Sequence, residues 1–186
     1  MSGSSSTFVL VSSALGVAVN LIGGTLVQMT KVPLLFLDTI GTMFTGAAFG
    51  PLAGVAVGFA TNLVQGVMTN PKDIPFALVN MAVGLIVGLV ARKGGFSYGK
   101  AFWTGLALAV VCPLVGTPIA VWIYGGITGG GLDFLFAWLK GSGAGIFTAA
   151  FLPRIAGNLV DKIGSALLVA FLLQRVPARL YRSDAR

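Results

Sequence analysis

The sequence predicts an all-α membrane protein, a single bundle of six transmembrane helices with both termini in the cytoplasm. Three observations support this fold class. Hydrophobic residues make up 56% of the 186 residues, only 9% are charged, and the mean hydropathy is +0.94. A soluble domain has roughly a quarter of its residues charged. The apolar residues also fall into six runs, and the basic residues gather between and after those runs.

Breakers and loops delimit the expected spans. A helix needs about 20 predominantly apolar residues to cross the bilayer core. The second span is short and ends at Gly50-Pro51, the third ends at Asn70-Pro71, and the sixth begins near Pro153. The six spans are 7–30, 33–49, 52–69, 74–91, 100–125 and 153–175.

The segment 126–145 between the last two spans is predicted to be a long outer loop with a short interfacial helix. It is rich in glycine at both ends and aromatic in the middle. Phe134, Phe136 and Trp138 suit the membrane boundary, where aromatic side chains are enriched. Loops of this length are often functional.

The basic residues set the expected orientation. With six spans, both termini lie on the same side as the 92–100 loop. That loop and the C-terminal tail hold seven basic residues and one acid, which places them in the cytoplasm. The basic residues form no continuous patch, so the net charge of +7 is not taken as a sign of nucleic-acid binding.

Polar side chains gather in the outer halves of the spans. A carboxylate facing lipid near mid-membrane costs at least ~2.5 kcal/mol, so such groups turn inward, pair or line a wet cavity. Their shared depth predicts one pocket open to the outside, with Asp38 in its wall or paired with Arg154 or Lys162. The candidate pocket residues in the spans are Asp38, Thr42, Asn62, Gln65, Asn80, Asn158, Asp161 and Lys162.

Structural roles for these residues stay open at this point. Asp38 could be an acid at a helix start that stabilises the N-terminal dipole. Asp161 and Lys162 could form a structural ion pair. Asn62 and Asn80 could only bridge helices, as polar side chains do in membranes.

Small residues predict close contacts between helices. Gly54 and Gly58 share one face of the third span, and Gly84 begins the same pattern in the fourth, so these spans are expected to pack together. In the first span Ala14 and Ala18 form a small-residue face. There, docking of a partner membrane protein competes with packing inside the bundle.

No catalytic set can be assembled, so we expect neither an enzyme nor a bound cofactor. The chain has no histidine and one cysteine, which leaves no Ser-His dyad and no His-based metal site. It has no P-loop. A membrane aspartyl protease would need two acids sharing a proton; Asp38 and Asp161 could meet, but no flanking motif supports that reading.

Several stretches resemble those of one known family. They are ALGVA with Ala14 and Ala18, FLDTIGTMFTGAAFGPLAGVAVG around the second and third spans, TPIAVWIYGGITGG, and NLVDKIGSALLVAFLLQRVPARL. Through them, most of the chain resembles the substrate-binding S components of energy-coupling factor (ECF) vitamin transporters. No signature indicates which vitamin is bound.

The resemblance implies a multi-pass protein of a bacterial or archaeal cell membrane. It would bind a vitamin or related micronutrient at the extracellular face, then associate with a transmembrane coupling subunit and two ATPase subunits. Ala14 and Ala18 match the AxxxA docking motif of that family. Phe134 and Trp138 would cover the ligand from the outer loop.

The alternative is a stand-alone secondary transporter or channel for a small solute. Such a protein would need a polar path through the inner half as well, or broken helices at the midplane. Pro113 and Pro118 could break the fifth span in that way.

Overall fold

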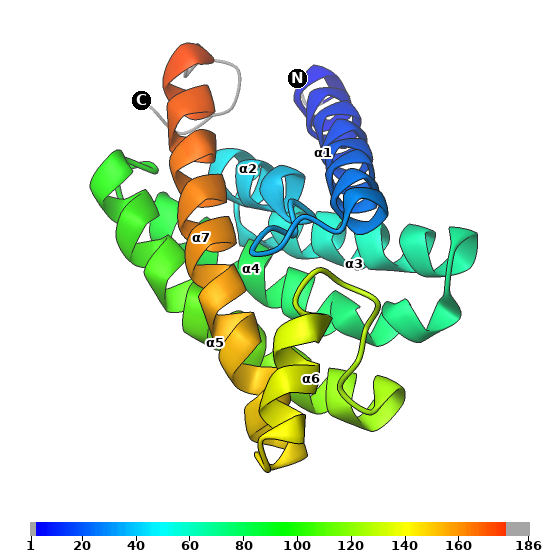
Figure 1. Cartoon of the computed structure of the whole chain (residues 1–186). Helices are drawn as coiled ribbons and strands as arrows, with labels where there is room; N and C mark the ends of the chain where they lie inside the picture. Colours follow the sequence, from blue (N-terminus) through cyan, green and yellow to red (C-terminus); the bar gives the residue numbers. More distant parts are fainter. Residues whose placement is uncertain (1–2, 178–186) are drawn as a thin grey trace.

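The computed structural model describes residues 3–177, and every regular element in them is a helix (Figure 1). This confirms the all-helical fold class. In chain order the elements are α1 (Gly3–Thr30), α2 (Ile40–Phe49), α3 (Pro51–Met68), the 3₁₀ helix η1 (Pro71–Phe76), α4 (Ala77–Arg92), α5 (Tyr98–Tyr124), α6 (Asp133–Gly141) and α7 (Ile146–Arg175).

Five helical segments of the described chain are long and apolar enough to cross a membrane. They are Ser6–Thr30, Pro51–Met68, Pro71–Arg92, Tyr98–Tyr124 and Ile146–Arg175. The apolar helix α2 has only 10 residues, which at 1.5 Å per residue covers about half of a ~30 Å bilayer core. The expected span 33–49 is therefore helical only from Ile40, and a count of six full spans stays a prediction.

Prolines interrupt the helices less than the sequence implied. Helix α7 begins at Ile146, so Pro153 lies inside it rather than at its start. Helix α5 also continues through Pro113 and Pro118. Proline is tolerated in membrane helices because neighbouring groups satisfy the freed backbone carbonyls, and so a proline is a weak boundary here.

Close glycine contacts join α3 to α4, as predicted. A Cβ atom added to Gly84 would lie 2.3 Å from the carbonyl carbon of Gly54, and one added to Gly58 would lie 2.6 Å from the carbonyl oxygen of Asn80. Helix α1 makes a similar approach to α2, where a Cβ on Gly16 would meet Thr45 Oγ1 at 2.8 Å. Only glycine permits these backbones to lie so near to one another.

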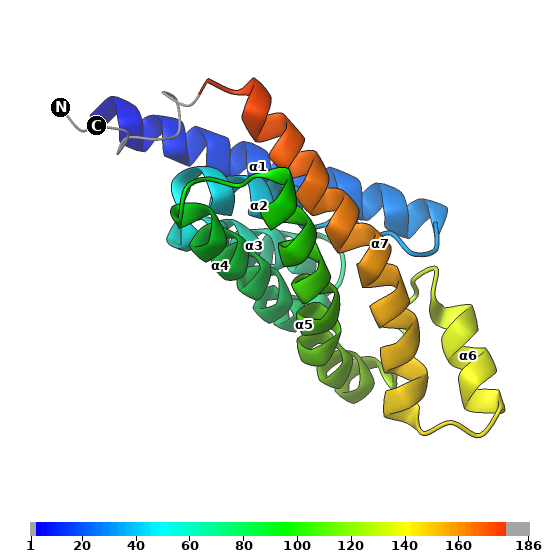
Figure 2. The ribbon, with the colours of Figure 1, turned by 90° about the vertical axis from the view of Figure 1, so that its left-hand side faces the viewer.

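The bundle has an apolar half and a polar half. Buried Met43, Val87, Leu108 and Val169 join α2, α4, α5 and α7 in one hydrophobic core. This core lies toward the end of the molecule where α1 starts and α7 ends (Figures 1 and 2). The buried asparagines of α3, α4 and α7 lie outside this core and line one cavity.

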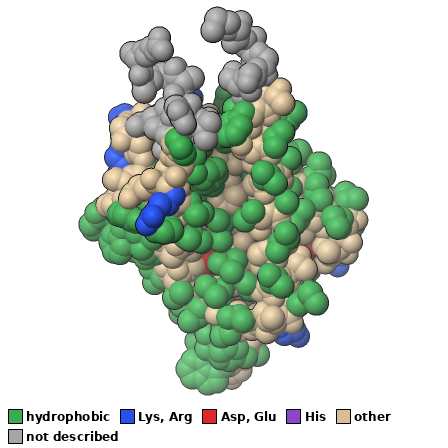
Figure 3. All heavy atoms as spheres, turned by 90° about the horizontal axis from the view of Figure 1, so that it is seen from above, with side chains coloured by type: hydrophobic (Ala, Val, Ile, Leu, Met, Phe, Trp, Pro, Cys, Tyr) green, Lys and Arg blue, Asp and Glu red, His purple; other side chains and the backbone are tan. Residues whose placement is uncertain are grey.

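The outer surface is hydrophobic, as a lipid-facing surface requires. Large apolar side chains such as Leu15, Leu52 and Trp122 are exposed on α1, α3 and α5. Viewed from the end that carries the start of α1, hydrophobic side chains cover much of the periphery (Figure 3). Arg179, Arg182 and Arg186 lie outside the described residues, and the membrane side on which the termini lie stays a prediction.

We expect Gly84→Ala to lower the free energy of unfolding by ~1–3 kcal/mol, because the added methyl group meets immovable backbone of α3. Thermal unfolding of the purified protein in detergent measures this. Gly164→Ala in α7 is the matched control, since a Cβ there meets nothing within 4 Å. Equal stability of the two variants would contradict the close packing of α3 on α4.

Candidate functional site

The segment between α1 and α2 adopts an unusual backbone conformation. Lys31, Leu34 and Leu37 have positive φ angles of 51°, 67° and 53°. Left-handed backbone is uncommon for residues other than glycine and costs of order 1–3 kcal/mol per residue. The segment therefore needs contacts from elsewhere in the protein to hold this shape.

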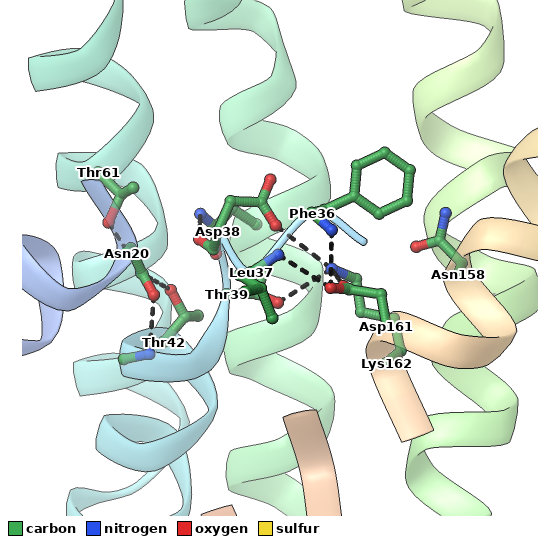
Figure 4. Close-up of polar contacts among 12 residues, drawn as sticks. Asn20, Phe36, Leu37, Asp38, Thr39, Thr42, Thr61, Asn158, Asp161 and Lys162 are labelled. Carbon is green, nitrogen blue, oxygen red and sulfur yellow. Dashed lines mark hydrogen bonds and ion pairs between the residues drawn. The ribbon is translucent and has the colours of Figure 1, made fainter. Parts of the chain in front are cut away.

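Asp161 of α7 supplies two of those contacts. Its Oδ1 atom accepts hydrogen bonds from the backbone N–H groups of Phe36 and Leu37, both at 2.9 Å (Figure 4). The predicted pocket residue Asp161 thus attaches the segment 31–39 to α7, and it is almost fully buried in doing so.

Lys162 links the same segment to α7 through its charge. Its Nζ atom lies 2.5 Å from Asp161 Oδ2 and 3.3 Å from Asp38 Oδ1, and it donates to Thr39 Oγ1 at 3.0 Å (Figure 4). The ammonium also lies 5.6 Å from the centroid of the Phe36 ring. A buried charge is tolerated only when it is paired and hydrogen-bonded, and Lys162 is both. Of the two partners considered for Asp38, the structure selects Lys162.

Two sets of amides join the neighbouring helices. Asn20 of α1 donates to Thr42 Oγ1 at 2.8 Å and Thr61 Oγ1 at 3.0 Å, and accepts from Gly41 N–H at 2.7 Å (Figure 4). Thr42, predicted as a pocket residue, is fully buried in this set. Asn20 was not predicted as a site residue, although an asparagine in the middle of an apolar span indicates a polar contact between helices.

The second set of amides lies at the wall of the cavity. Asn80 Nδ2 donates to the backbone oxygen of Asp38 at 3.2 Å and to Asn62 Oδ1 at 3.1 Å. These asparagines therefore bridge α3, α4 and the segment 31–39, which is the structural role left open above. Both also line the cavity.

The polar half of the bundle encloses a cavity of about 230 Å³. The segment 31–39, the 128–132 loop and every helix except α2 contribute to its wall. The predicted residues that line it are Asp38, Asn62, Gln65, Asn80, Asn158 and Lys162. Their joint presence around one space is the arrangement that the shared depth predicted.

The short helix α6 faces the cavity with a different aromatic ring from those predicted. Phe134 and Trp138 are 62% and 66% exposed and point away from it, whereas Phe136 is buried and lines it. Residues four apart share one side of a helix and the residue midway between them lies on the other side. The two aromatic faces were equally visible in the sequence, and composition did not distinguish them.

Several further wall residues were not predicted as site residues. Asp73 lies in η1, where its Oδ1 accepts from Tyr124 Oη at 2.6 Å. Asp133 accepts from Thr128 N–H and Gly129 N–H, and so shapes the 128–132 loop. The apolar part of the wall includes Phe36, Phe76, Val79, Cys112, Leu132 and Pro153.

Arg154 takes a different position from the one considered for it. Its guanidinium lines the cavity and donates to the backbone oxygens of Ala150 at 2.8 Å and Gly126 at 3.2 Å. It thereby connects α7 to the loop after α5. Within residues 3–177, no group of three or more His, Cys, Asp or Glu side chains is placed to hold a metal ion.

We expect Asp161→Asn to lower the free energy of unfolding by ~3 kcal/mol, because the change leaves the buried Lys162 with only the partly exposed Asp38 as its counter-ion. Thermal unfolding in detergent measures the loss, and limited proteolysis reports the release of the segment 31–39. The double variant Asp161→Asn/Lys162→Met should recover part of the stability, since it also removes the unmatched charge. Additive losses in the double variant would contradict coupling between the two side chains.

Comparison with known proteins identifies the family. The family model described as ECF transporter, substrate-specific component matches residues 8–173 of the chain. No curated protein and no solved structure matches it. The matched region contains all five long apolar helical segments nearly in full, the segment 31–39 and the whole cavity wall. The chain therefore belongs to the family of substrate-specific components of ECF transporters, which are substrate-binding transport subunits and not enzymes.

Proposed function

We propose that the protein captures a vitamin or a related water-soluble micronutrient from outside the cell and holds it in the cavity of the polar half. The cavity supplies what a small nutrient needs for recognition, a largely apolar wall with a few placed polar groups. Asn62, Gln65 and Asn158 provide amide donors and acceptors in that wall, and Phe36, Phe76 and Phe136 provide ring surfaces.

The position of the cavity carries this proposal. The hydrophobic core of Met43, Val87, Leu108 and Val169 fills the other half of the bundle. A stand-alone channel or secondary transporter needs polar groups along a path through both halves or helices broken at the midplane. The uninterrupted α5 favours the capture of a ligand from one side over passage through the chain alone.

Delivery into the cell requires the other subunits of the transporter. Family membership implies a transmembrane coupling subunit and ATPase subunits as partners, and ATP hydrolysis by those partners would supply the energy. Ala14 and Ala18 are exposed on α1, while Gly16 and Asn20 face the bundle. We propose that this exposed small-residue face docks on the coupling subunit.

The binding step is tested with freshly purified protein. Native mass spectrometry should show a co-purified small molecule, and titration calorimetry with individual vitamins should find one that binds tightly. Purified protein without a co-purified molecule and without affinity for any vitamin would contradict the proposed function. Uptake by vesicles that hold this chain alone, without ATPase partners, would support the stand-alone transporter instead.

The docking step makes a separate prediction. Changing Ala14 and Ala18 together to leucine should leave ligand binding by the purified protein unchanged, because neither residue lines the cavity. Uptake by cells or vesicles with the complete transporter should fall at least about tenfold, since the larger side chains prevent close approach of the coupling subunit. Val19→Leu, also on an exposed part of α1, is the control. Intact uptake in the double variant would refute docking at this face.

A further inference from the structure

The acidic residues of the chain are concentrated at the cavity. The chain has five acidic residues and 12 basic ones. Asp38, Asp73 and Asp133 line the cavity, and Asp161 lies directly behind Lys162. Among residues 3–177, the basic residues that line it are Arg154 and Lys162. The site thus carries four negative and two positive formal charges, a net of −2, in a chain whose net charge is +7.

Of the two positive charges of the site, that of Lys162 is already paired. Lys162 forms ion pairs with two carboxylates, those of Asp38 and Asp161. Among residues 3–177 Arg154 forms no ion pair, and its N–H groups donate to the backbone oxygens of Ala150 and Gly126. Because the negative formal charges of the site outnumber the positive ones, an anionic ligand would add to an existing excess of negative charge.

Two carboxylates keep capacity for a further positive charge. The Asp38 side chain is 40% exposed and uses Oδ1 for Lys162. Asp73 accepts one hydrogen bond, from Tyr124, and no Lys or Arg among residues 3–177 forms an ion pair with it. A carboxylate has about four acceptor positions, so both groups can bind a cationic donor from the cavity.

The aromatic wall strengthens this preference. Phe36, Phe76 and Phe136 line the cavity together with the carboxylates of Asp38 and Asp73. Ring faces attract cations, most strongly where water is excluded. Lys162 already lies 5.6 Å from the Phe36 centroid in this arrangement, which shows that the wall accommodates a positive charge beside a ring.

We propose that the molecule bound in this cavity is a cation at neutral pH, a small ring compound or amine with a positively charged nitrogen held among Asp38, Asp73 and the phenylalanine rings. This inference rests on the proposed function, because it names the class of ligand for the same cavity. The placement of Asp38, Asp73 and Asp133 around one cavity is the observation that supports a cationic ligand.

A panel of probes sorted by charge tests the proposal on the purified full-length protein. The cationic probes are thiamine, pyridoxamine and choline; the neutral ones are pyridoxine, nicotinamide and riboflavin; the anionic ones are 4-pyridoxate, nicotinate, pantothenate and biotin. Pyridoxamine, pyridoxine and 4-pyridoxate share one ring and differ mainly in charge. Titration calorimetry gives a Kd for each probe, and we expect the tightest probe to be cationic.

Two nearly isosteric variants then change the charge of the wall in opposite directions. Asp73→Asn removes a negative charge but keeps an acceptor for Tyr124, and should weaken binding of the best cationic probe about tenfold. Gln65→Glu adds a negative charge at a position that also lines the cavity, and should strengthen it. The second variant keeps the test decisive if the first does not fold.

The outcomes separate this inference from the proposed function. A neutral or anionic probe that binds most tightly overturns the charge assignment and leaves nutrient capture supported. A cationic probe whose affinity is unchanged in both variants also overturns it. Failure of every probe to bind wild-type protein, with no molecule co-purified, counts against the proposed function itself.

Discussion

The ion pair between Asp161 and Lys162 is the interaction on which the site depends. Removing two charges from water is costly, and their attraction offsets that cost only when the remaining donors and acceptors are also satisfied. Here the second carboxylate oxygen binds two backbone N–H groups of the segment 31–39, and the ammonium reaches Asp38 and Thr39 in the same segment. The main role of the pair is therefore to position the segment 31–39 rather than to stabilise the fold. It fixes a strained connection against α7 and places Asp38 in the cavity wall.

Outside the site, glycine contacts and apolar packing hold the helices of the bundle together. Glycines bring α3 and α4 into backbone contact, and the apolar core closes the half of the molecule where α7 ends. A closely packed half thus supports a more open one. The walls of the cavity come from segments far apart in the chain, and Asp161, Lys162 and Asn80 join these segments.

The sequence predicts those parts of this structure that follow from composition and from the spacing of residues. Hydropathy predicted six spans, of which five coincide with helices long and apolar enough to cross a membrane. The spacing of Gly54, Gly58 and Gly84 predicted the contact of α3 with α4. The depth of the polar residues predicted a shared cavity. The sequence did not reveal that 33–39 is not helical, because that conformation depends on hydrogen bonds that its backbone donates to Asp161, over 120 residues away. Nor did it distinguish Phe136 from Phe134 and Trp138, since the rotation of α6 is set by tertiary contacts.

Asn20 has a consequence for how the chain is assembled in the membrane. Its side-chain oxygen would have no donor if α1 were inserted into lipid alone, because the interior N–H groups of a helix are used by its backbone, and an unsatisfied polar group in hydrocarbon costs several kcal/mol. Its three partners lie at Gly41, Thr42 and Thr61, so the amide is satisfied only after α2 and α3 have entered the bilayer. We therefore expect α1 to reach its final position only when α2 and α3 are present, as part of a three-helix unit.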